Sequence, residues 1–262
     1  MLIFFTLLTS CSSREENKIP SYITTREVND SIYVDVKNTI ISSSFLRIEN
    51  KKNQEIKIID FKKPDTINIL SFHKSEMDTT QLANTYKFGL YYGASSIATY
   101  DSLYNYSLPF SKGKRYKVLQ GNNGSFSHKG SLSQFAIDFK MDIGQEVCAI
   151  REGVITTTKA DSDEGGSSKN YLKKANLIMI NHNDGTFSQY IHLKKNGVIV
   201  KKGDTVKKGQ IIGYSGNTGF STKPHLHFAV YKPTRNGLVS IPFILDSIPS
   251  KKYVKGKYAI NN

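Results

Sequence analysis

The stretch "STKPHLHFAVY", residues 221–231, joins two histidines to a run of aromatic and branched side chains. Such a run, preceded by the polar segment "GNTGFSTKP", predicts a β-strand that follows a loop. Because side chains alternate along a strand, His225 and His227 share one face, with Cα atoms roughly 6–7 Å apart. Leu226 and Phe228 then point to the opposite face, into a core. Two imidazoles on one face suit a metal ion or a half-exposed polar surface, and spacing alone leaves both readings open.

The chain has 262 residues, enough for one large domain or two ordinary ones, and 38% of them are hydrophobic. Its net charge is +14, which favours anionic partners such as nucleic acid, a membrane surface or a polyanionic cell wall. The lysines occur in dispersed pairs such as Lys201-Lys202, without a basic helix or a basic–aromatic cluster of the kind that contacts bases. We therefore expect no nucleic-acid partner.

Residues 1–20 predict a lipoprotein signal peptide followed by a polar tether. The apolar run at residues 2–8 is far too short to span a bilayer, but it fits the hydrophobic region of a secretory signal. The "LTSC" that ends at Cys11 resembles the bacterial lipobox, which implies cleavage before Cys11 and lipid attachment to its sulfur. Several acyl chains would anchor the protein in a bacterial cell envelope. Ser12, where Asp would signal inner-membrane retention, favours the outer membrane, facing the periplasm or the cell surface. The alternative is an ordinary apolar N-terminus.

Residues 21–105 predict a small β-sandwich-like domain of unknown role, because short alternating segments are separated by Asn, Lys and Pro turns. The segments are "SIYVDVKNTI", "SSFLRIEN", "QEIKIIDF", "DTINILSF" and "YKFGLYYG". No helical period is convincing anywhere in the chain. The expected fold class is therefore all-β.

Residues 106–250 predict a second, antiparallel β domain, followed by a basic C-terminal tail at 251–262. The candidate strands are "QFAIDFKM", "EVCAI", "GVITTTK", "NLIMIN", "TFSQYIHL", "QIIGYS" and "HLHFAVY". Asp184-Gly185, between the fourth and the fifth, is a hairpin turn signal.

Five of the six histidines fall in this second half, together with an aspartate in an apolar setting. Asp138 interrupts the apolar "QFAIDF", where a carboxylate is costly unless it is paired or bound to a metal. His128 lies in the Gly/Ser-rich "SFSHKG", and His192 ends "FSQYIHL", where alternation puts it on the same strand face as Tyr190. Histidine and aspartate together suit zinc, whose catalytic sites use three protein ligands and leave a fourth position for water.

The remaining candidates have structural interpretations. His182 lies at the "NHNDG" turn, and His73 has no polar companion in the first half. Cys148, within "EVCAI", is expected to be a small buried hydrophobe.

Residues 126–231 resemble the lysostaphin/LytM-type zinc metallopeptidases, which cut peptides of the bacterial cell wall. The resemblance rests on blocks in the same order and spacing, and it does not extend to residues 21–105. The blocks are "SHKG" with a following "AIDF", "IGQEVCAIREGVI", "YIHL", "VKKGDTVKKGQIIGYSGNTG" and "STKPHLHF". It implies an antiparallel β-sheet or barrel-sandwich domain with a groove for an extended peptide, one Zn²⁺ per chain and endopeptidase activity on peptidoglycan peptides.

The resemblance also implies roles for five residues. His128, Asp138 and His227 would ligate zinc, which polarises the scissile carbonyl and lowers the pKa of bound water toward roughly 7. His225 would act as the general base beside the metal. His192 would face the metal across the groove and donate a hydrogen bond to the developing oxyanion. There is no "HExxH" helix, so the base is a histidine and not a glutamate.

Two positions depart from the commoner family pattern. Nine residues separate His128 from Asp138, where three are usual, and Lys223 stands where a small glycine is usual. We expect Lys223 to narrow or charge the rim of the groove.

Two alternative functions use parts of the same pattern. A catalytically silent wall-binding or regulatory relative would have lost ligands, whereas all five positions are filled here. "VKKGDTVKKGQIIGYSG" also resembles a lipoyl or biotinyl carrier barrel, but the "HNDG" turn lacks the lysine dipeptide that would carry the cofactor.

Overall fold

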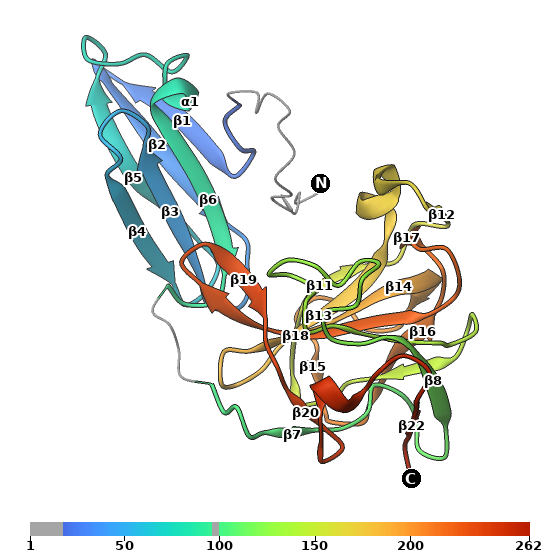
Figure 1. Cartoon of the computed structure of the whole chain (residues 1–262). Helices are drawn as coiled ribbons and strands as arrows, with labels where there is room; N and C mark the ends of the chain where they lie inside the picture. Colours follow the sequence, from blue (N-terminus) through green and yellow to red (C-terminus); the bar gives the residue numbers. More distant parts are fainter. Residues whose placement is uncertain (1–17, 96–99) are drawn as a thin grey trace. The chain divides into compact units, whose positions relative to one another are not determined.

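The computed structural model describes residues 18–95 and 100–262, and its regular structure is almost entirely β (Figure 1). The helical segments in these ranges are α1 (Leu82–Thr85) and the 3₁₀ turns η1 (Lys169–Lys174) and η2 (Ser250–Lys252). This confirms the all-β fold class. Cys11 lies outside the described residues, as does most of the predicted signal segment. Within the described ranges, every helix is too short or too polar to cross a membrane.

The chain divides into two compact units. The first consists of segments that all precede Gly89, and the second contains the whole of Gly89–Asn262. The domain boundary expected between residues 105 and 106 stays a prediction.

The strands before Gly93 form two three-stranded sheets. The first has the order β1 (Ile23–Val28), β2 (Ser31–Asn38), β5 (Asp65–His73), and the second has the order β4 (Ile56–Phe61), β3 (Ser44–Asn50), β6 (Tyr86–Tyr92). The five predicted segments correspond to β2–β6. In β2, buried and partly exposed residues alternate, which is the pattern of a half-buried strand. The strand β1 was missed because Ile23 is its single buried residue, so it carries no alternation.

The second unit is organised around an antiparallel sheet of eleven strands. Its main path runs β15 (Thr205–Val206), β11 (Gly153–Lys159), β13 (Asn176–Asn181), β14 (Phe187–Val198), β18 (Leu226–Thr234), β9 (Ile137–Phe139), β8 (Arg115–Gln120), β22 (Tyr258–Ile260). The strands β10 (Glu146–Cys148), β16 (Ile211–Ser215) and β19 (Gly237–Ser240) pair beside this path. All seven predicted segments contain strands, and the hairpin at Asp184-Gly185 joins β13 to β14.

Smaller pairings complete the unit. The strand β7 (Asn105–Tyr106) pairs with β20 (Ile244–Leu245), which also pairs with β21 (Ile248–Pro249). Within the predicted polar loop, β12 (Gly165–Gly166) pairs in parallel with β17 (Gly219–Phe220). This last pairing fixes the segment that precedes the "HLH" motif.

The core of the second unit lies on one face of the main sheet. Leu226 and Phe228 are fully buried in it, together with Tyr190 and Leu193 of the neighbouring strand β14. The expectation that Leu226 and Phe228 point into a core is therefore confirmed. On the opposite face of β18, Ala229 and Tyr231 are buried in a second, smaller cluster, and His227 lies at the start of that face.

The basic segment 251–262 packs into this unit. Its strand β22 pairs with β8, and Ala259 belongs to the core. Tyr253 is also buried, and its hydroxyl donates to the backbone oxygen of Leu245 at 2.8 Å. The lysines of the segment are exposed, whereas Tyr253 and Ala259 are buried. The many lysines made these two buried positions hard to detect in the sequence.

His182 and Cys148 have the surroundings expected of structural residues. His182 is buried, with Nδ1 2.8 Å from the Glu152 carbonyl oxygen and Nε2 3.0 Å from Ser188 Oγ. Burial lowers the pKa of His182 to about 4. Cys148 is a buried free thiol, and burial raises its pKa.

Candidate metal centre

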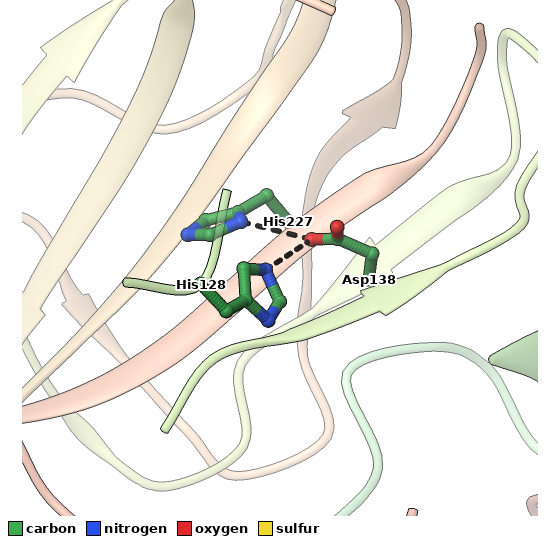
Figure 2. Close-up of side chains that lie close together, drawn as sticks. All are labelled: His128, Asp138 and His227. Carbon is green, nitrogen blue, oxygen red and sulfur yellow. Dashed lines mark hydrogen bonds and ion pairs between the residues drawn. The ribbon is translucent and has the colours of Figure 1, made fainter. Parts of the chain in front are cut away.

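The first contact of the site follows from strand register. The strands β9 and β18 run antiparallel, with Asp138 directly opposite His227, while Leu226 pairs with Phe139. Directly opposed residues project to the same face, so the carboxylate and the imidazole meet on the face opposite the core. Asp138 Oδ1 lies 2.9 Å from His227 Nδ1 (Figure 2). Because side chains alternate along β18, the burial of Leu226 places His227 on the face that carries Asp138.

His128 reaches the same carboxylate oxygen from the loop between β8 and β9. Its Nε2 lies 3.1 Å from Asp138 Oδ1, and its side chain is completely buried. On the other side of the ring, Nδ1 is 2.8 Å from the backbone oxygen of Gly121. Because a carbonyl only accepts, Nδ1 carries a proton, and Nε2 is the ring atom that faces Asp138 and the cluster. The nine-residue spacer does not prevent His128 from joining Asp138 and His227.

Gln120, which the sequence analysis missed, holds the other oxygen of the aspartate. It is the partner of Asp138 in the β8–β9 pairing, so Gln120, Asp138 and His227 form a row across three adjacent strands. Its Nε2 donates to Asp138 Oδ2 at 3.1 Å. The one signal in the sequence was a polar residue at the end of the alternating segment "RYKVLQ".

His192 enters the site through a β-bulge. Along β14, Ile191 is paired with Leu177 and Leu193 with Asn176, which leaves His192 as an extra residue. Its backbone φ of 69° is in the left-handed region. The expectation that His192 shares a strand face with Tyr190 is therefore wrong: Tyr190 is in the core, and the bulge turns His192 to the opposite face. Simple alternation would have buried His192 among apolar side chains.

His192 lies beside His225 and His227, with ring centroids 4.5 Å and 6.0 Å away respectively. Its Nδ1 is 2.7 Å from the backbone oxygen of Thr218. The proton therefore resides on Nδ1, and Nε2 carries a lone pair.

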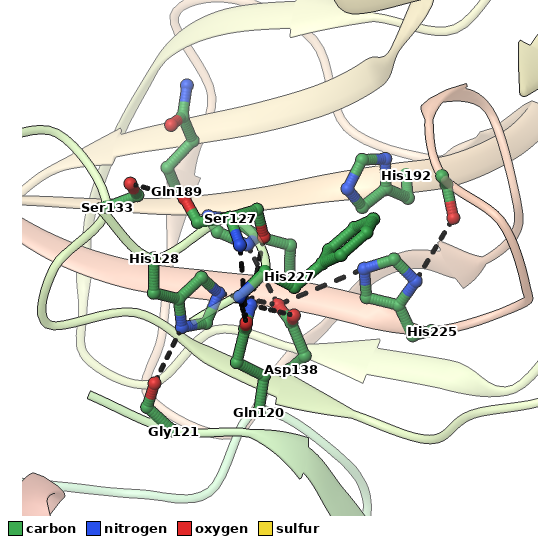
Figure 3. A network of polar contacts seen from close by, with 12 residues as sticks. Gln120, Gly121, Ser127, His128, Ser133, Asp138, Gln189, His192, His225 and His227 are labelled. Carbon is green, nitrogen blue, oxygen red and sulfur yellow. Dashed lines mark hydrogen bonds and ion pairs between the residues drawn. The ribbon is translucent and has the colours of Figure 1, made fainter. Parts of the chain in front are cut away.

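The ring of His225, like that of His192, turns Nδ1 toward a backbone carbonyl. His225 directly precedes β18, and its Nδ1 lies 2.8 Å from the Lys223 carbonyl oxygen and 3.1 Å from Ser221 Oγ. Its Nε2 is 3.9 Å from Asp138 Oδ1 (Figure 3). His192 and His225 thus both contact a backbone carbonyl through Nδ1, which leaves Nε2 as the ring nitrogen free of that contact. Lys223 enters the site through its backbone oxygen, a contact that its side-chain type did not indicate.

The charges of the cluster are set by burial and by mutual contacts. Burial alone would raise the pKa of Asp138, but hydrogen bonds from His128 and His227 hold it well below its ordinary value. Burial disfavours the charged form of His128, yet Asp138 raises the net pKa of that ring. Burial lowers the pKa of His227, and burial with the neighbouring His225 and His227 lowers that of His192 to about 3. The cluster is therefore built on an ionised carboxylate that is held by the imidazoles of His128 and His227.

This donor set fits a divalent metal ion. His128, Asp138 and His227 each offer one ligand atom, and these atoms all lie within 4.8 Å of one another. Two imidazole nitrogens and one carboxylate oxygen suit zinc. Gly121 orients His128 and Gln120 orients Asp138, as outer partners do in metal sites. The fold and the site together define a candidate metal-dependent hydrolase.

Comparison with known proteins identifies the family. Residues 133–239 match the model of Peptidase family M23, and the C-terminal domain of this chain belongs to that family. The matched range includes Asp138, His192, His225 and His227. His128 lies five residues before its start, so the place of His128 in the site depends on the geometry given above.

Relatives and solved structures of the same kind are similar over part of the chain. Lysostaphin from Staphylococcus simulans is 46% identical over 95 residues, which are 36% of this chain and 17% of lysostaphin. The peptidoglycan DD-endopeptidase ShyA from Vibrio cholerae is 36% identical over 118 residues, which are 44% of this chain and 24% of ShyA. The solved catalytic domain of lysostaphin from S. simulans is 32% identical, with a TM-score of 0.33, and the match covers 52% of this chain and 86% of that one. The chain thus spans less than a third of the curated relatives' length.

Proposed function

We propose that this protein is a zinc metalloendopeptidase that hydrolyses peptide bonds in bacterial peptidoglycan. The proposal is carried by one observation, the convergence of His128, Asp138 and His227 within a domain of peptidase family M23. Relatives named lysostaphin and peptidoglycan DD-endopeptidase support the choice of substrate. The net charge of +14 supports contact with an anionic wall polymer.

His128 Nε2, Asp138 Oδ1 and His227 Nδ1 are the atoms that would hold the ion. A bound zinc ion supplies a Lewis acid that polarises a carbonyl group and makes water easier to deprotonate. His225 Nε2, next to Asp138, accepts a proton from the attacking water. The Nδ1–H of His225 stays on the Lys223 carbonyl, so the ring keeps its orientation while Nε2 passes the proton to the leaving amine.

The position of the proton on the His192 ring limits what this residue can do. Its proton is on Nδ1, bound to the Thr218 carbonyl, so a neutral His192 presents an acceptor and no donor at Nε2. It can stabilise an oxyanion only after Nε2 gains a proton. With the ring of His225 4.5 Å away, the two histidines form one proton-handling pair in which each Nε2 is available.

Digestion of defined muropeptides by the purified protein, with products identified by mass, tests the proposal. We expect about one zinc per chain, release of peptide fragments, loss of activity with a chelator and recovery with zinc. Zinc-loaded protein that binds peptidoglycan but releases no product would indicate the catalytically silent alternative. Protein that takes up no stoichiometric zinc would remove the enzyme proposal.

We also propose that the protein is lipid-anchored in a bacterial cell envelope through Cys11, because "LTSC" follows a short apolar run. Its membrane contact would then depend on acyl chains. A Cys11→Ser variant should move from the membrane fraction to the soluble fraction. A variant that stays with the membranes after fractionation would contradict lipidation at Cys11.

A further inference from the structure

Two phenylalanines, Phe126 and Phe220 of β17, stack on each other in segments that also carry contacts of the candidate metal centre. The ring centroids of Phe126 and Phe220 are 6.1 Å apart, and their planes differ by 6°. Phe126 is 68% exposed although it is a large apolar residue in the polar segment "GNNGSFSHKG". The core of the domain uses neither ring. An exposed aromatic pair of this kind is an available apolar contact surface.

Phe126 is tied to the ligand side of the site. Its backbone N–H donates to Gln120 Oε1 at 3.0 Å, and Gln120 Nε2 donates to Asp138 Oδ2 at 3.1 Å. It is also two residues from His128. The ring is therefore placed by the same side chain that orients the carboxylate.

Phe220 is tied to the proton-handling side. It lies between Thr218, whose carbonyl binds His192, and Ser221, whose hydroxyl contacts His225. The pairing of β12 with β17 holds this segment, because Gly219 N donates to Glu164 O at 2.8 Å. The ring contact thus joins the segment that precedes His128 to the segment that precedes His225.

We propose that Phe126 and Phe220 form a subsite that binds the peptide substrate next to the His/Asp cluster. This inference rests on the proposed function, because the occupant is the peptide to be cut. Phenyl rings offer no hydrogen-bonding group, so they select aliphatic surface: the methyl group of alanine, the Cα of glycine or the methylenes of a longer side chain. Because the two rings stack on each other, the peptide would contact their outer surface, chiefly that of Phe126, which is 68% exposed.

The test compares Phe126→Ala, Phe220→Ala and the conservative Phe126→Tyr in the full zinc-loaded protein. The measurements are the kinetics of muropeptide hydrolysis and co-sedimentation with insoluble peptidoglycan. We expect each alanine variant to raise KM about tenfold while kcat stays within about threefold. Binding to peptidoglycan should weaken in parallel, and Phe126→Tyr should retain most of both. Zinc content reports whether the site itself is intact.

Ile143→Ala is the matched control. Ile143 is also a large, exposed apolar residue, at 58% exposure, and it takes no part in the hydrogen bonds and ring contacts described for Phe126 and Phe220. The control should behave as the wild type. Unchanged KM and unchanged binding in both alanine variants would overturn the subsite. If the wild type binds peptidoglycan but releases no product, and Phe126→Ala weakens that binding, the hydrolase proposal is wrong and the subsite is supported.

Discussion

One carboxylate oxygen is the centre of the candidate site. Asp138 Oδ1 is 2.9 Å from His227 Nδ1, 3.1 Å from His128 Nε2 and 3.9 Å from His225 Nε2. A buried carboxylate requires such partners, and imidazole nitrogens that face one carboxylate oxygen are placed to share a cation with it. The candidate metal ligands therefore lie next to the histidines proposed to handle protons. Single substitutions should separate their roles.

Replacement of His192 or His225 by alanine should remove hydrolysis without removing the metal. Neither is among the three ligand groups, so zinc content should stay near that of the wild type, while kcat/KM falls by about 10²–10⁴-fold. Zinc analysis and muropeptide kinetics on the same preparations check this. His73→Ala, at an exposed histidine in the first unit, is the control and should leave both values unchanged. Full activity in His192→Ala or His225→Ala would refute the role given to that residue.

Gln120→Ala tests the outer partner of the metal centre. Without its hydrogen bond to Asp138 Oδ2, the carboxylate loses orientation, and zinc affinity should fall by about 10–100-fold. Competition with a chromophoric chelator measures the affinity. Gln210→Ala is a suitable control, because Gln210 accepts a hydrogen bond from Lys207 N in an exposed turn. Equal zinc affinity in the wild type and Gln120→Ala would show that Gln120 has no part in the site.

At the scale of elements, the site depends on two irregular features of otherwise regular strands. The bulge in β14 turns His192 out of the core, and the short β12–β17 pairing holds the carbonyl of Thr218 that binds it. Gly219 is at the centre of the second feature. Its φ is +81°, and a Cβ there would lie 2.4 Å from Ala175 Cβ.

Gly219→Ala should therefore disturb both stability and the orientation of His192. We expect the free energy of unfolding to fall by about 1–3 kcal/mol, with a loss of kcat that persists under conditions where the variant is fully folded. Urea denaturation and kinetics measure the two effects. Gly203→Ala is the matched control, since its φ is +97° with nothing within 4 Å of the added Cβ. If the two variants lose the same stability and neither loses kcat, β17 does not position the site.

At the scale of the whole molecule, buried neutral histidines link folding to pH. The pKa of His182 is lowered from 6.5 to about 4, so between these values the unfolded chain binds more protons than the folded one. The contribution of His182 to the free energy of unfolding is therefore fully present above pH 6.5. It decreases as the pH falls toward 4, by about 3 kcal/mol in total.

A His182→Gln variant isolates this contribution. It should be less stable than the wild type at pH 7, yet lose less stability between pH 7 and pH 4, as measured by urea denaturation across that range. His73→Gln, at an exposed position, should retain the slope of the wild type. Identical slopes for wild type and His182→Gln would contradict the assignment of this pH dependence to His182.

Much of the fold followed from local pattern. The alternation in "HLHFAVY" predicted both the burial of Leu226 and Phe228 and the common face of the two histidines. The predicted segments in both halves contain strands, and the Asp184-Gly185 turn joins two of them. The strand β1 escaped detection because Ile23 is its single buried residue, and β7, β12 and β17 escaped because two residues are too few to show alternation.

The sequence by itself determined the all-β class, the positions of the longer strands and the candidate residues for the chemistry, because strand periodicity and side-chain type are local properties. Tertiary structure alone decided how they meet: that Gln120, Asp138 and His227 form one row, that a bulge turns His192 toward His225, and that the basic end of the chain closes the sheet at β22. Register and bulges depend on the pairing of segments as far apart as Lys117 and Tyr258, and that pairing is settled by which side chains can be buried together.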